Sequence, residues 1–192
     1  RALIEAYVGN YIARPDGLHR MLLFRRKEVV SANNSIRKAL FGPDADVIEE
    51  DEQLMIMATT DTPYCDDPMD STRYYSGQTF RVHSKERQTY SIRIGEETFE
   101  IPHYRVSLDG QTPVNIVFGI TENQMDQEKL GGAEFQAAIS AAAAYGRAED
   151  DFGNKLGSWE PFKQLQGDFV RVAYTYASSV HRAQGSSLDY VY

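Results

Sequence analysis

The sequence predicts a mixed α/β fold in which a domain built on a parallel sheet is interrupted by a β-rich insertion. Two observations support this prediction. Charge is divided unevenly along the chain, and helix-like periodicity near the amino terminus gives way to short strand-like runs in the middle. At 192 residues the chain fits one domain, or one domain with a sizeable insertion. The apolar fraction of 42% is sufficient for a hydrophobic core.

The net charge of -8 is concentrated in the middle of the chain. Residues 1–48 carry 8 Lys and Arg against 5 Asp and Glu, residues 49–155 carry 9 against 20, and residues 156–192 carry 3 against 3. A strongly acidic middle between two segments of different character is typical of an insertion. We therefore predict a discontinuous domain formed by residues 1–48 and 156–192, and an inserted subdomain formed by residues 49–155.

The first segment has the pattern of an α/β layer. Apolar residues recur at helical spacing over residues 1–13, and Met21–Phe24 form a short apolar run typical of a buried strand. Residues 28–42 place apolar side chains on one helical face before Gly42 and Pro43 end the helix. Strand, helix and the short run Val47-Ile48 predict a layer containing a parallel sheet.

The middle and last segments of the sequence consist mainly of short strand-like runs. Short runs rich in β-branched and aromatic residues predict an antiparallel meander or small barrel, and a helix is expected from Thr121 to about Arg147. After Gly157 the sequence predicts one or two helical turns, a strand, a turn that enters a short helix, and the start of another strand. The predicted strands of these two segments are residues 53–60, 78–84, 89–94, 97–108, 113–120, 169–177 and 188–192.

Residues 176–189, YASSVHRAQGSSLD, resemble motif V of superfamily 1 DNA helicases of the RecD and Dda type. The pattern of that motif is roughly Tyr-Ala-x-Thr-x-His-Lys-x-Gln-Gly-x-x-x-Asp. The sequence keeps its order and spacing, with a serine hydroxyl at Ser179 and a basic Arg182 in place of the Thr and Lys. The match is long and chemically mixed. Residues 158–179 also resemble the approach to motif V in the Dda-type phage helicases.

Residues 22–42, LLFRRKEVVSANNSIRKALFG, are similar to motif IV of the same family. There an apolar strand leads to Asn-Lys-x-Val-x-x-x-Asn and then to Ile-Arg. Arg26 departs from the pattern, since it stands where the family usually has Asn. The residues that fit are Lys27, Val29, Asn33, Ile36 and Arg37.

The resemblance implies a fragment of an ATP-dependent DNA helicase acting in replication, recombination or repair. In the family, motifs IV and V lie on the second of two RecA-like motor domains, into which a small barrel of the Src-homology-3 type is inserted. The resemblance thus implies an incomplete motor domain 2A over residues 1–48 and 156–192, and an inserted domain 2B over residues 49–155. It also implies ATP with Mg²⁺, single-stranded DNA and a motor domain 1A/1B outside these residues.

The resemblance assigns site residues in motif V. Ser178, Ser179 and His181 would hold the backbone of single-stranded DNA, because hydroxyls and amides at a helix N-terminus suit phosphate oxygens. Gln184 and Gly185 would face the nucleotide, with Gln184 orienting a phosphate or water during catalysis. The plainer interpretations stay open: the serines could only cap a helix, and His181 could be an ordinary surface or packed histidine.

Arg25 and Arg26 could supply charge toward a γ-phosphate, as an arginine finger does, with Arg26 in a catalytic role. A solvated turn is the alternative. Trp159 is the only tryptophan; it could stack on a base or anchor the core. Glu49–Glu52 contains an Asp-Glu pair like that of a Walker B strand, but we interpret it as a solvated acidic loop.

Several features are missing from the sequence. No Gly-Lys dipeptide occurs, so there is no phosphate-binding GxxxxGK[ST] loop, and the Tyr-x-x-x-Thr-Arg pattern of motif VI is absent as well. We therefore expect no ATP hydrolysis from these residues alone. No metal-ligand spacing occurs, and no apolar run is long enough for a membrane span. The single Cys65 excludes an intramolecular disulfide framework and fits a cytoplasmic protein.

The acidic middle leads to a further expectation about partners. A surface at -11 repels phosphate, so we expect domain 2B to be a lever, or a docking face for another domain or protein. A second hypothesis for the whole chain is a non-enzymatic module that binds nucleic acid or protein and keeps one half of a motor.

Overall fold

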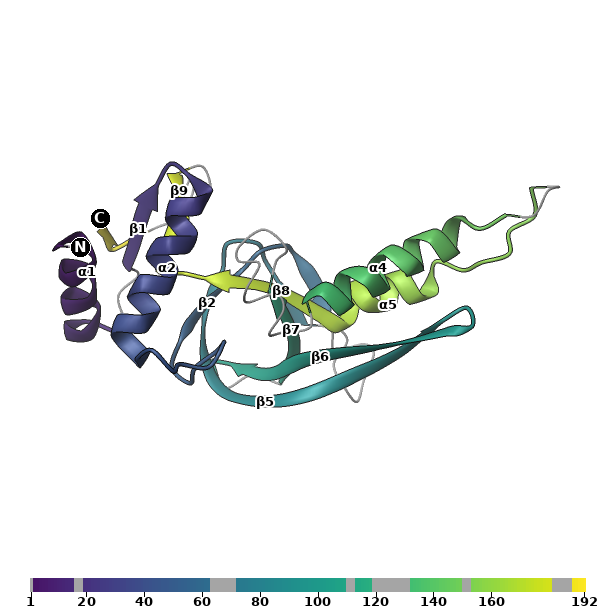
Figure 1. Cartoon of the computed structure of the whole chain (residues 1–192), viewed down its shortest axis with the longest axis horizontal. Helices are drawn as coiled ribbons and strands as arrows, with labels where there is room; N and C mark the ends of the chain where they lie inside the picture. The colour runs from purple at the N-terminus through teal and green to yellow at the C-terminus, as the bar shows by residue number, and fades with distance from the viewer. Residues whose placement is uncertain are drawn as a thin grey trace.

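The computed structural model describes residues 2–15, 19–62, 72–109, 113–118, 132–149, 153–180 and 188–192. These residues form four helices, a small parallel sheet, a five-stranded mixed ring and a two-stranded ribbon. Figure 1 shows that these parts follow one another along the longest axis of the molecule: the parallel sheet at one end, the ring in the middle and a projecting arm at the other end. The predicted α/β class is confirmed at this level.

The parallel sheet brings the two ends of the chain together. β1 lies in the centre and pairs in parallel with β9 on one side and β10 on the other. The predicted strand, helix and parallel sheet of the first segment are therefore confirmed. The elements are α1 (Ala2–Ala13), β1 (His19–Leu23), α2 (Arg26–Phe41), β9 (Ala177–Ser179) and β10 (Tyr190–Val191).

Helix α2 forms for the reasons that its sequence indicates. Val29, Ala32 and Ile36 recur at helical spacing and are buried in the main core. The helix ends at Gly42, whose φ of 91° is a conformation that residues with a Cβ rarely adopt. Helix α1 packs on the same core through Tyr7 and Tyr11.

The middle of the molecule is a closed ring of mixed strands, not the small antiparallel barrel that the sequence predicted. β2 pairs with both β5 and β8, which closes the ring. β7 and β8 run parallel, because the chain between them crosses over through two helices instead of turning back directly. The strands are β2 (Gln53–Ile56), β5 (Thr79–Ile94), β6 (Glu97–Leu108), β7 (Val114–Phe118) and β8 (Phe169–Tyr174), and β3 (Thr60–Thr62) and β4 (Thr72–Tyr74) form the ribbon.

The arm is the part of β5 and β6 that extends beyond the ring, together with α4 (Gly132–Arg147) and α5 (Glu160–Asp168) alongside it (Figure 1). Residues 78–84 and 89–94 were predicted as separate strands, but β5 runs through both. The polar residues between them, Lys85–Gln88, pair directly with β6. The arm has its own core, formed by Ile92, Ile94, Ile101, Phe135, Ala138, Ala142, Leu165 and Phe169.

The strand predicted over residues 169–177 is divided between the ring and the parallel sheet. Its first six residues are β8, and after a bend at Thr175 and Tyr176 the chain continues as β9. β8 therefore completes the ring although it lies after the boundary expected near residue 156. The division into domains 2A and 2B stays a prediction.

Candidate functional site at the carboxyl edge of the parallel sheet

The parallel sheet places the predicted motif IV and motif V segments side by side. Leu23, the last residue of β1, lies opposite Ser179, the last residue of β9. Both strands therefore end at the same edge of the sheet. In open α/β sheets, ligands bind at the carboxyl ends of the strands, so this edge is the best candidate for a functional site.

The residues that follow β1 form a basic turn, which we define as Phe24–Lys27. All four side chains of the basic turn are exposed. Arg25 is the N-cap of α2 and makes no side-chain cap bond, because a guanidinium has no acceptor; the Glu28 carboxylate accepts the Arg25 N–H instead, at 3.3 Å. Cations at the positive end of a helix dipole are unfavourable in isolation, whereas an anion bound there is favourable.

Phe24 was predicted to lie in a buried strand, and this prediction is wrong. β1 ends at Leu23, and Phe24 is 85% exposed where the chain turns into α2. Sequence reasoning therefore missed an exposed aromatic side chain at the candidate site. The available signal was its position directly before the basic pair Arg25-Arg26, where a strand was expected to end.

The two serines of the motif V segment differ in exposure. Ser178 is 2% exposed, and its Oγ has no hydrogen-bond partner among the described residues. Ser179 is partly exposed and lies opposite Leu23, next to the basic turn. Ser179 is therefore the hydroxyl that a ligand at this edge can reach. The predicted site residues His181, Gln184 and Gly185 lie outside the described residues, and their roles stay predictions.

Trp159 does not lie at this edge. It precedes α5 at the end of the arm that is far from the parallel sheet (Figure 1). Its indole packs over Gly146 of α4 and edge-on against Phe162, and the residue is 38% exposed. Stacking of a base on Trp159 stays a prediction, but it would form a contact separate from the edge that carries Ser179.

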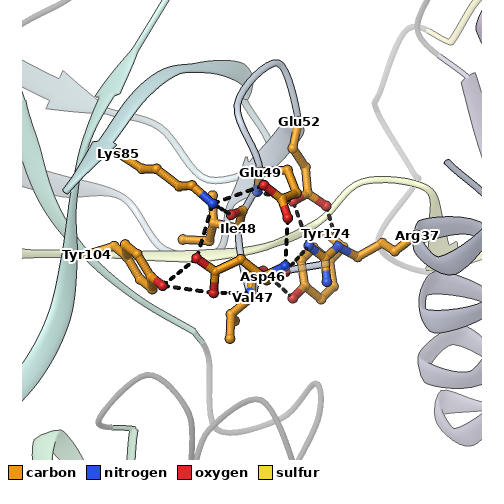
Figure 2. Close-up of polar contacts among 9 residues, drawn as sticks. All are labelled: Arg37, Asp46, Val47, Ile48, Glu49, Glu52, Lys85, Tyr104 and Tyr174. Atoms are coloured by element: carbon orange, nitrogen blue, oxygen red, sulfur yellow. Dashed lines mark hydrogen bonds and ion pairs between the residues drawn. The ribbon is translucent and has the colours of Figure 1, made fainter. Parts of the chain in front are cut away.

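A second set of polar residues joins α2 to the ring, and the acidic loop lies at its centre (Figure 2). Glu49–Glu52 was predicted to be solvated, yet Glu52 is fully buried. Its carboxylate accepts hydrogen bonds from Arg37 at 2.6 and 3.0 Å and from the Tyr176 hydroxyl at 3.1 Å. The prediction is confirmed for the exposed Glu50 and Asp51 and is wrong for Glu52, because the partner that allows its burial lies on α2, outside the acidic stretch.

Both members of the Glu52–Arg37 pair have a pKa that differs from its ordinary value. Burial raises the pKa of Glu52 above its ordinary value, although the hydrogen bonds and charge of Arg37 oppose this. Burial acts to lower the pKa of Arg37, but the Glu52 carboxylate outweighs it and raises that pKa. The Arg37 guanidinium also lies over the Tyr174 ring, 4.4 Å from its centroid. α2 is thus fixed to β8 and to the loop before β2 by one buried cation.

The start of the same loop is held by a second ion cluster. The Lys85 ammonium of β5 lies 3.1 Å from Asp46 and 3.0 Å from Glu49, and it also donates to the Ile48 carbonyl. The Tyr104 hydroxyl of β6 donates to both Asp46 oxygens, at 2.8 and 2.7 Å. Val47 and Ile48, expected to be a strand, are instead buried in a bend.

This second cluster predicts a stability that depends on pH. Although burial opposes it, hydrogen bonds from Tyr104, the Val47 N–H and Lys85 lower the pKa of Asp46 below its ordinary 3.8. A carboxyl with a lowered pKa in the folded state stabilises the fold above its ordinary pKa, and this is lost as the pH falls through the folded value. We expect the urea midpoint of the wild type to fall more steeply below about pH 4 than that of Asp46→Asn. Parallel curves would contradict this expectation.

The bend between β8 and β9 is fixed to the same loop and to the first residue of β2 by three consecutive side chains. The Tyr174 hydroxyl donates to the Val47 carbonyl at 2.7 Å, and the Thr175 hydroxyl donates to the Gln53 carbonyl at 3.1 Å. The Tyr176 hydroxyl donates to Glu52, as described above. The strand that ends in Ser179 is therefore tied to the ring directly before it enters the parallel sheet.

No protein-family model matches the chain, and a search of curated proteins finds no similar protein. The helicase resemblance therefore depends only on residues 22–42 and 158–189, the segments that resemble motif IV and motif V with its approach. The described part of the chain brings together no group of three His, Cys, Asp or Glu suited to a metal ion, and none of its helices is long and apolar enough to cross a membrane.

Proposed function

We propose that the chain is part of an ATP-dependent DNA helicase of the RecD/Dda type, in which the carboxyl edge of the parallel sheet binds phosphate. One observation carries the proposal: the register of β1 and β9 places the basic turn beside Ser179, so the motif IV and motif V segments, far apart in sequence, meet at one edge. A translocating motor needs such a meeting point, because the groups that respond to the nucleotide must act on those that hold the strand.

The chemistry of the edge supports this proposal. Arg25 and Arg26 are exposed cations in a chain of net charge -8, and they lie at the positive end of α2. Phe24 offers an exposed aromatic face on which a base can stack. Ser179 offers a hydroxyl to a phosphate oxygen. Cations, an aromatic face and a hydroxyl are the groups with which proteins hold the phosphates and bases of a single strand.

The proposal also states what other segments must supply. The P-loop, the Mg²⁺ ligands and the motif VI arginine would come from motor domain 1A/1B and from residues outside these 192. By the resemblance, Gln184 and Gly185 would complete the nucleotide side. In this proposal Arg25 and Arg26 contact the phosphates of the strand, rather than the γ-phosphate considered from the sequence.

The test is binding of a fluorescein-labelled oligothymidylate to the 192-residue chain, followed by anisotropy over a range of salt concentrations. We expect Arg25→Ala/Arg26→Ala to weaken binding about tenfold or more at low salt. If both side chains contact phosphates, the slope of log K against log salt should also fall in magnitude by about 1.4. Phe24→Ala should weaken binding with little change in this slope, because stacking releases no counterions.

The control is Arg87→Ala/Arg93→Ala, which removes two exposed arginines from β5 in place of the basic turn. This variant has the same net charge as the test variant, so a general electrostatic effect would weaken both equally. Equal losses would contradict the assignment of the site to the sheet edge. No binding by the wild type at low salt would contradict the single-strand contact, and the hypothesis of a protein-binding module would then be preferred.

A further inference from the structure

Asn33 of α2 makes a pair of hydrogen bonds that tie this helix to the first residue of β9. The Ala177 N–H donates to Asn33 Oδ1 at 2.8 Å, and Asn33 Nδ2 donates to the Ala177 carbonyl at 3.3 Å. Both residues are buried. The side-chain amide thus contacts Ala177 through the same donor and acceptor that a neighbouring strand would use.

The position of this pair in the sheet is specific. On the β1 side, the Met21 N–H donates to the Tyr176 carbonyl, so the backbone groups of Ala177 point to the opposite side of β9. β9 is an edge strand among the described residues, with β1 as its only paired strand. Asn33 therefore satisfies the open side of β9 at the residue directly before Ser178 and Ser179.

The side-chain amide of Asn33 is surrounded by apolar residues, so it needs its hydrogen bonds to Ala177. Asn33 lies on the buried side of α2, among Val29, Ala32 and Ile36. A polar side chain buried there without hydrogen bonds costs free energy, and an apolar residue would pack without that cost. The oxygen and the nitrogen of the Asn33 amide both bond to the backbone of one residue, Ala177. The two bonds together fix the position of α2 relative to β9.

We propose that Asn33 is a positioning residue, which holds the Ala177–Ser179 strand in register with α2 and so sets the distance between Ser179 and the basic turn. Asn33 is about two helical turns from Arg26, on the same continuous helix. A shift of β9 is then a shift of Ser179 relative to Arg25 and Arg26. The role of this distance in holding a phosphate backbone rests on the proposed function, whereas the clamp on β9 does not.

The clamp itself is tested by amide hydrogen exchange of the 192-residue chain without DNA. In Asn33→Ala, we expect the Ala177 amide to exchange about tenfold faster than in the wild type, with the Val172 amide of β8 much less affected. Asn33→Leu keeps the volume and removes both hydrogen bonds, and it serves if the alanine variant folds poorly. Ser35→Ala, two residues along on the exposed side, should leave Ala177 unchanged. Equal acceleration at Ala177 and Val172 would overturn the clamp, since it would show only general destabilisation.

The effect on the site is tested by a double-mutant cycle in oligothymidylate binding. Asn33→Ala and Ser179→Ala should each raise Kd several-fold, and Asn33→Ala should add less than about twofold in the Ser179→Ala background. The same added loss in both backgrounds would overturn the claim that Asn33 acts through Ser179. If the wild type does not bind DNA, the proposed function fails, and hydrogen exchange at Ala177 still decides whether Asn33 holds β9.

Discussion

Replacing Arg37 by alanine should lower the free energy of unfolding by about 3–5 kcal/mol at pH 7, because it leaves the Glu52 carboxylate buried without its cation. The two remaining partners of Glu52, the Glu49 N–H and the Tyr176 hydroxyl, cannot replace a guanidinium. Loss of Arg37 should raise the pKa of Glu52 further. The variant should therefore lose less stability relative to the wild type at pH 5 than at pH 7, which urea unfolding at both values measures.

Two further variants test whether the loss of stability comes from the buried charge of Glu52. Arg73→Ala removes an ion pair with Asp61 in which both side chains are more than half exposed, so it should change the free energy of unfolding by no more than about 1 kcal/mol. Arg37→Met/Glu52→Leu removes both buried charges and should be more stable than Arg37→Ala. A loss below about 1 kcal/mol in Arg37→Ala would show that this pair does not hold α2 to the ring.

The second large effect is expected at Gly157, near the far end of the arm. A Cβ at this position would lie 1.7 Å from the Tyr145 carbonyl oxygen, so the backbone of α4 or of the loop before α5 must move. We expect Gly157→Ala to cost about 1–3 kcal/mol. It should also shift the emission of Trp159 to longer wavelength, because this single tryptophan packs on Gly146 in the same part of the arm.

Gly9→Ala is the matched control for this substitution. A Cβ at Gly9 has no atom within 4 Å, and the residue lies inside α1, where alanine is favoured over glycine by about 1 kcal/mol. This variant should be as stable as the wild type or more stable, with the Trp159 emission unchanged. If Gly157→Ala also leaves stability and emission unchanged, the contact between residue 157 and Tyr145 does not constrain the arm.

The local elements could be predicted because each depends on a short stretch of sequence. The periodicity of Val29, Ala32 and Ile36 identified α2, and β-branched and aromatic runs identified the ring strands. The closure of the ring could not be predicted, since it requires β2 to pair with β8, a strand more than a hundred residues away. The residues 169–177 also gave no indication that the chain bends between two sheets.

The same distinction applies to the candidate site. Ser179 was identified from the motif V pattern, and Arg25 and Arg26 from their charge in the turn after the first strand. The parallel register brings the three residues to one edge. Phe24 was missed because an apolar residue after a strand-like run has the same pattern whether it is buried or exposed. Glu52 was misjudged because its burial depends on Arg37, and no pattern within the acidic stretch indicates which distant cation is its partner.

The order of the strands also constrains when the chain can fold during synthesis. β1 gains its two neighbours, β9 and β10, only after residue 176 has been made, and β2, which can pair earlier with β5, gains its second neighbour only with β8. Until residue 174 has left the ribosome, the antiparallel strands β2, β5, β6 and β7 can pair in order, but the ring cannot close. Such non-local pairing is slow and leaves strand edges open to other chains. The nascent protein should therefore depend on chaperones or low temperature for soluble expression.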